Sequence, residues 1–118
     1  MPFMMSKVNF PVVKDKEILL KNLLGKAVEV LPGMTEEYLM FGLEDNRKIY
    51  LRGESEIPCA YIEVGIFGNE THFGYKEFSL EVTKIFNAVL DISAKNIYIR
   101  FYDIESWSVG GMYFDKNN

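Results

Sequence analysis

One pattern of predicted secondary structure occurs twice along the chain, and it constrains the fold more than any other feature. By the spacing of its apolar residues, each half is predicted to form a strand, a helix and a second strand. Pro2 corresponds in this way to Pro58, and Tyr38 to Tyr98, at an offset of about sixty residues. The predicted segments are strand 2–10, helix 14–31 and strand 38–44 in the first half, and strand 59–67, helix 73–90 and strand 97–103 in the second.

A strand–helix–strand unit places its two strands parallel, with a right-handed crossover. Two units therefore predict an α/β (α+β) domain, with a four-stranded mixed sheet, two helices on one of its faces, and short extra strands. The repeats span 2–51 and 58–114, so we expect residues 1–118 to form a single domain.

Local signals predict where these elements begin and end. Asp15 is the expected N-cap of the first helix, and Pro32-Gly33 should end it. A turn at 45–47 should lead into a short return strand at 49–51. The polar end, residues 115–118, is expected to be mobile.

Alternation along the strands predicts two unlike sheet faces. The face under the helices should carry Leu39, Phe41, Leu43, Ala60, Ile62, Val64, Ile66, Ile97, Ile99 and Phe101. The opposite face should carry Tyr38, Met40, Cys59, Tyr61, Glu63, Phe67, Tyr98, Arg100 and Tyr102. Each predicted helix has an apolar side that should face the sheet. Its residues are Ile18, Leu19, Leu23, Ala27, Val30 and Leu31 in the first helix, and Phe78, Val82, Ile85, Phe86, Val89 and Leu90 in the second.

Two helices can cover only one face of this sheet. The uncovered face is rich in aromatic side chains, and such surfaces mark partner sites. Because most soluble oligomers are closed and symmetric, we expect a ring of identical chains. The alternative is a solvated face on which the tyrosines are incidental.

Composition excludes several classes of protein. A net charge of −4, with Lys and Arg interspersed among acids, argues against nucleic-acid and membrane partners. The first residues lack the order of a signal peptide, so a cytoplasmic location is expected. With one cysteine and one histidine, neither a disulfide nor a closed zinc site is expected. Cys59 is predicted to be a buried small hydrophobe and His72 a solvated loop residue; no cofactor or metal is expected.

Several segments resemble the family of macrophage migration inhibitory factor and D-dopachrome tautomerase. They are the start Met1-Pro2-Phe3, the stretch Gly53-Glu54-Ser55-Glu56-Ile57-Pro58-Cys59-Ala60, the end of the central strand Ile66-Phe67-Gly68, and Ile97-Tyr98-Ile99-Arg100-Phe101 through Glu105-Ser106-Trp107. The last pieces look closer to D-dopachrome tautomerase. The resemblance implies a homotrimer with active sites at subunit interfaces, and keto–enol tautomerisation of aromatic carbonyl compounds such as phenylpyruvate or dopachrome. Some relatives are secreted without a signal peptide and act as cytokine-like signals, so a secreted form with a receptor is a further expectation.

The resemblance also implies the site residues. Pro2, exposed as the terminal residue once Met1 is removed, would be the general base. An α-amino group has a pKa of about 7.7–8.0, which apolar burial lowers further toward the range that suits proton transfer. If Met1 stays, the Pro2 nitrogen is an amide and cannot be the base. Without the resemblance, Met-Pro is simply how some chains begin.

Other positions of the resemblance would bind the substrate. Tyr98 and Arg100 would reach the proline from a neighbouring subunit, with Arg100 holding a carboxylate; a salt bridge from Arg100 to Glu63 is the alternative. Tyr38 and Phe67 would line the apolar wall of the pocket, and Val109 and Phe114 would form its back. Plain packing is the alternative for each of them.

Two departures from the family pattern bear on function. Met34 stands where relatives commonly carry a lysine that binds the substrate carboxylate, and Gly110-Gly111-Met112-Tyr113-Phe114 replaces the common chain ending. These departures leave a second function open: a cytokine-like trimeric signalling or binding protein with a vestigial pocket.

Overall fold

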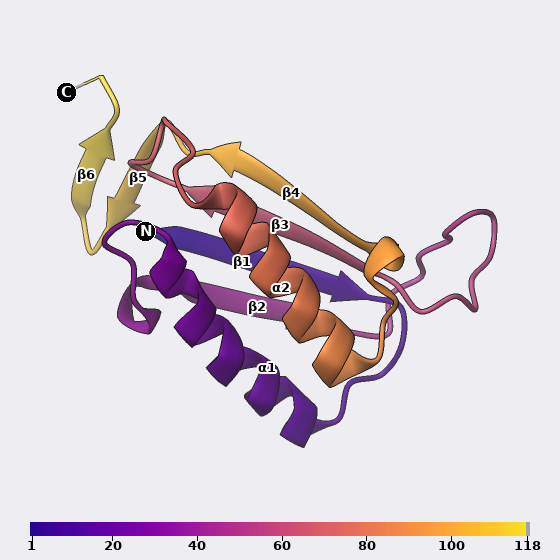
Figure 1. Ribbon diagram of the computed structural model, residues 1–118. Coiled ribbons are helices and arrows are strands. Elements are labelled where there is room, and N and C mark those ends of the chain that lie inside the picture. Colours follow the sequence, from indigo (N-terminus) through magenta and orange to yellow (C-terminus); the bar gives the residue numbers. More distant parts are fainter. Residues whose placement is uncertain (118) are drawn as a thin grey trace.

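The computed structural model describes residues 1–117 and shows the predicted sheet with both helices on one face (Figure 1). The strands of the main sheet are β1 (Pro2–Val8), β2 (Met40–Glu44), β3 (Ala60–Ile66) and β4 (Ile97–Asp103). The helices are α1 (Lys14–Ala27) and α2 (Tyr75–Leu90), with 3₁₀ turns at Val28–Val30, Glu36–Tyr38 and Ala94–Asn96. A separate hairpin of β5 (Ser106–Val109) and β6 (Met112–Asp115) lies beyond one end of the sheet, near the N-terminus (Figure 1).

The sheet topology confirms the repeat. The strand order is β2-β1-β3-β4; β1 pairs with β2 in parallel and β3 with β4 in parallel. The two halves meet at an antiparallel ladder between β1 and β3, which runs from Pro2 opposite Ile66 to Val8 opposite Ala60. The mixed α+β fold predicted from the repeat is therefore observed.

The core lies between the helices and the sheet. Met4, Ile62 and Val64 of the sheet are fully buried there, and the predicted sheet-facing residues of β2 and β4 pack at its edge. All six residues predicted for α2 are buried. The prediction for the first helix was right for Ala27 and Leu31, which are buried. It was wrong for Ile18 and Leu19, which are 44% and 48% exposed, because the buried face of α1 instead carries Leu20 and Leu24.

Several predicted boundaries move by one to four residues. The first helix begins after Val13, without a side-chain cap, so Asp15 lies inside its first turn and is not the N-cap. The predicted return strand is only a single bridge between Leu51 and Glu54. At the other end, Asp115 belongs to β6 rather than to a mobile tail, and Asn118 lies outside the described residues.

The start of α2 depends on Gly74. Its φ of +86° is one that side-chain-bearing residues rarely adopt, and a Cβ there would lie 2.7 Å from the Val30 carbonyl oxygen. A glycine here leaves room for the 3₁₀ turn Val28–Val30, which follows α1, to contact the start of α2. Within residues 1–117, neither helix combines the length and apolar character needed to cross a membrane.

Candidate functional site

The N-terminal end of β1 borders a pocket of about 220 Å³. Pro2 is buried at this end of the strand and pairs with Ile66 of β3. The lining residues are Met1, Pro2, Glu37, Tyr38, Leu39, Met40, Trp107 and Val109. The predicted residues Pro2, Tyr38 and Val109 thus come together from β1, a 3₁₀ turn and β5, although they are distant in sequence.

The amino terminus lies in an apolar setting beside Met34. The Met1 amino group donates a hydrogen bond to Met34 Sδ over 3.1 Å, and Met34 packs against the core. Burial lowers the pKa of this amino group below its ordinary value. Because a thioether is a weak acceptor, it stabilises the charged amine less than an oxygen would. An amine placed here is therefore biased toward its neutral, basic form.

Phe67 and Phe114 lie close to each other. Their ring centroids lie 6.0 Å apart, and Phe114 pairs with Trp107 across the β5–β6 hairpin. Neither ring lines the pocket, so within one chain these two predicted residues pack against each other and are not part of the pocket wall.

Sequence reasoning assigned no role to Trp107. Its side chain lines the pocket, and its enclosed Nε1–H has no hydrogen-bond acceptor among residues 1–117. A buried donor without an acceptor is costly and therefore uncommon. The Glu105-Ser106-Trp107 segment stood out in the sequence, but nothing in it indicates that the indole lines the same pocket as Pro2.

Tyr98 and Arg100 do not reach Pro2 within one chain. Tyr98 is paired with Tyr61 of β3, whereas Pro2 is paired with Ile66 of the same strand. These two positions put the backbones of Tyr98 and Pro2 about 16 Å apart along the strand direction. Tyr98 instead borders a second apolar hollow of about 240 Å³, which Cys59 and Tyr61 also line. Cys59 is buried, as predicted, and burial raises the pKa of its thiol.

Arg100 is paired on the open face of the sheet. Its Nη1 lies 3.1 Å from Glu63 Oε2, and its guanidinium stands 5.2 Å from the centre of the Tyr102 ring. The salt bridge that was the alternative for Arg100 is therefore present. Tyr98 and Met40 remain 54% and 64% exposed on this face, which leaves the predicted aromatic surface uncovered in the single chain.

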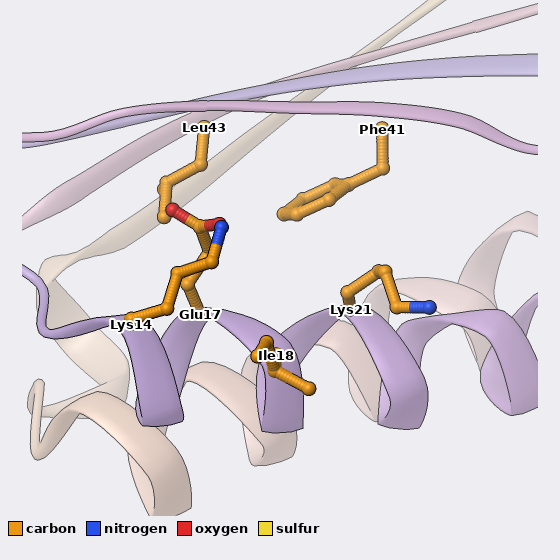
Figure 2. A pocket seen from close by; sticks show the side chains of 6 residues that line it. All are labelled: Lys14, Glu17, Ile18, Lys21, Phe41 and Leu43. Atoms are coloured by element: carbon orange, nitrogen blue, oxygen red, sulfur yellow. The ribbon is translucent and has the colours of Figure 1, made fainter.

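Another hollow lies between α1 and the edge strand β2 (Figure 2). Phe41 and Leu43 reach into it from β2, while Lys14 and Glu17 of α1 lie together with their charged ends 2.9 Å apart. The second lysine, Lys21, lies 3.8 Å from Glu36. Because both lysines already face carboxylates and no predicted site residue lies here, we place the candidate site at Pro2.

One known protein family matches almost the whole chain. The family described as "Macrophage migration inhibitory factor (MIF)" matches residues 1–113. The chain belongs to the macrophage migration inhibitory factor family. Its fold is therefore shared with the family over almost its whole length, as the resemblance in the sequence implied.

Solved structures agree with this family assignment. The homologue of macrophage migration inhibitory factor from Prochlorococcus marinus is 30% identical, with a TM-score of 0.81 over 95% of this chain and 98% of that one. Leishmania major MIF2 is 23% identical, with a TM-score of 0.87 over 97% of both chains. A fused 4-OT, described as an asymmetric trimer, is 17% identical, with a TM-score of 0.80 over 93% of this chain and 94% of that one. No curated protein sequence gives a significant match.

Proposed function

We propose that this member of the macrophage migration inhibitory factor family is a cofactor-independent tautomerase that uses Pro2 as its general base after removal of Met1. The observation that carries the proposal is the position of Pro2 at the edge of an apolar pocket, next to the Met1 amino group, whose pKa is lowered by burial. A base with a pKa near the working pH transfers protons most effectively.

The proposed reaction moves one proton within the substrate. The neutral Pro2 nitrogen takes a proton from the carbon next to a carbonyl group, which gives an enol or enolate. The protonated nitrogen then returns a proton at the other position, so no net oxidation occurs. The secondary amine of proline sits on a rigid ring, which fixes the direction of its lone pair.

We further propose that the active unit is a homotrimer in which Tyr98 and Arg100 of a neighbouring subunit complete the pocket. The uncovered aromatic face supports this, and so does the register, which keeps Tyr98 away from its own Pro2. Light scattering after size-exclusion chromatography is expected to give three times the mass of one chain. A monomer at micromolar concentration would contradict the trimer.

The test of the function is a tautomerase assay on phenylpyruvate and D-dopachrome with protein whose N-terminus is shown by mass spectrometry to be Pro2. Turnover that disappears when the same chain retains Met1 is the expected result. An equal rate from both forms would exclude the Pro2 nitrogen as the base.

Substitution of Met34 tests whether a positive charge at this position improves turnover of a negatively charged substrate. Met34→Lys is expected to raise kcat/KM for phenylpyruvate by about 10- to 100-fold, because a charge-assisted hydrogen bond to the carboxylate is worth about 1.5–3 kcal/mol. The methyl ester of the same compound, which lacks the charge, should gain little. Leu80→Lys, which adds the same charge on the exposed side of α2, is the control. Equal gains on acid and ester would contradict this role.

A signalling or binding protein with a vestigial pocket is the second candidate. Two observations favour it: the uncharged thioether of Met34 lies beside the amino terminus, and Arg100 is paired with Glu63. Both weaken the binding of a substrate carboxylate by the site. Full binding of a partner by Pro2→Gly, combined with no turnover by the wild type, would favour this function over catalysis.

A further inference from the structure

The pocket beside Pro2 has a one-sided set of charges. Its wall is mostly apolar or aromatic, and no Lys, Arg or His among residues 1–117 borders it. Glu37, in the 3₁₀ turn Glu36–Tyr38, is its acidic residue. Apart from the amino terminus, the charged group at this pocket is therefore a carboxylate.

The charge of Glu37 is not neutralised by a neighbour. Within residues 1–117 its side chain forms no ion pair. Glu36, which directly precedes it, is directed away from the pocket. Its carboxylate lies 3.8 Å from Lys21 of α1, and a Cβ added to Gly25 of the same helix would collide with it. Two adjacent glutamates thus have different surroundings, and only Glu37 borders the pocket.

The amino terminus does not supply a lasting positive charge. Burial lowers the pKa of the Met1 amino group, and the thioether of Met34 is a weak acceptor for it. In the proposed reaction the Pro2 nitrogen is the base, so it has to be neutral when the substrate binds. At that moment the pocket offers a substrate carboxylate no cation of its own chain.

A neighbouring subunit that contributes Arg100 would not change this balance. The Glu63 carboxylate accompanies Arg100, with Oε2 at 3.1 Å from Nη1. The Tyr61 hydroxyl donates to the same oxygen over 3.2 Å. Because the ion pair carries no net charge, a substrate carboxylate would have to displace Glu63 before it could bind Arg100.

The rest of the wall suits an uncharged ligand with a ring. Tyr38, Leu39 and Val109 are among the residues that line the pocket, whose volume is about 220 Å³. A cavity of about 150 Å³ holds benzene, so one six-membered ring with a short side chain fits this space. A carboxylate moved from water into such a setting without a partner loses its hydration and gains little in return.

We propose that the Pro2 pocket selects uncharged aromatic ketones or aldehydes, and that Glu37 is the specificity-determining residue that disfavours substrates with a carboxylate. The choice of substrate rests on the proposed function, whereas the preference in binding does not. Glu37 acts by repulsion between like charges and takes no part in proton transfer. A neutral ligand of the same shape is unaffected by this repulsion.

The first test measures binding with two ligands of equal shape, the anion 3-phenylpropanoate and the neutral 3-phenylpropanamide. Protein that begins at Pro2 is titrated at about pH 8.5, above the ordinary pKa of an α-amino group, and the amide resonances of Tyr38 and Val109 are followed by NMR. The wild type is expected to bind the neutral ligand about tenfold more tightly. In Glu37→Gln, affinity for the anion should rise about threefold, with no change for the neutral ligand.

Glu36→Gln is the matched control, since it removes the same charge from the same turn but not from the pocket. It should bind both ligands as the wild type does. Raising the ionic strength from about 0.01 M to about 0.15 M shortens the screening length from about 30 Å to about 8 Å, so the gain in Glu37→Gln should shrink. Tighter binding of the anion by the wild type, equal gains for both ligands, or no binding of either would overturn the proposal.

Kinetics separate this proposal from the proposed function. In Glu37→Gln, KM for phenylpyruvate should fall about threefold with kcat little changed, and KM for its methyl ester should stay the same. Turnover by a wild type whose KM for the acid does not respond to Glu37→Gln would overturn the selectivity and leave the tautomerase intact. If no carbonyl compound is turned over, the proposed function fails and the binding titrations alone decide on Glu37.

Discussion

Replacing Pro2 by glycine is expected to lower kcat/KM for phenylpyruvate by about 10²-fold, and retention of Met1 by up to about 10⁴-fold, the range that a positioned general base contributes. The glycine amine still accepts a proton, but it loses the ring that directs the lone pair. A retained Met1 converts the nitrogen into an amide, which has no basic lone pair. The two changes should therefore differ in severity.

The matched control is Pro11→Gly, since Pro11 is exposed beyond the end of β1 and borders no part of the pocket. It should keep the wild-type rate. Each variant needs a measured mass for the terminus and an unchanged oligomeric state. A Pro2→Gly rate equal to that of the wild type would mean that another group abstracts the proton.

Phe78→Ala is expected to lower the free energy of unfolding by about 3–5 kcal/mol, which is a large fraction of the stability of a domain of this size. Phe78 is fully buried in α2, and its ring meets Phe101 of β4 edge-on, with centroids 6.4 Å apart and planes at 71°. Truncation removes the contact that fastens the helix to the sheet and leaves a cavity.

Urea unfolding at one fixed protein concentration measures this loss, because association would make stability depend on concentration. Phe73→Ala is the control, since Phe73 is 69% exposed and should change stability by no more than about 0.5 kcal/mol. Equal losses in the two variants would show that Phe78 does not carry the core contact.

The sequence predicted the packing well where the apolar residues of a helix lie on a single face. In α2 the residues Phe78, Val82 and Phe86 define a single stripe, and all three are buried. In α1 the pairs Leu19-Leu20 and Leu23-Leu24 make two neighbouring faces of the helix apolar. The sequence of the helix alone therefore does not show which face packs against the sheet. The contact with the sheet selects Leu20 and Leu24.

The site was predictable only in part. Pro2, Tyr38 and Val109 meet in one pocket, as the family resemblance implied. That Glu37 rather than its neighbour Glu36 borders this pocket depends on the 3₁₀ turn that holds both, and no local pattern announces it. That the indole N–H of Trp107 has no acceptor among residues 1–117 likewise depends on the β5–β6 hairpin, which brings Trp107 to the pocket beside Met1 and Pro2.

The meeting of the two halves at β1 and β3 has a consequence for how the chain folds. Each half alone supplies a two-stranded parallel sheet and one helix, and β1 and β3 would both be edges. So small a unit cannot bury the core that the halves share. The domain is in effect an obligate dimer of two half-chains tied together by residues 45–59, and we expect it to fold and unfold as one cooperative unit.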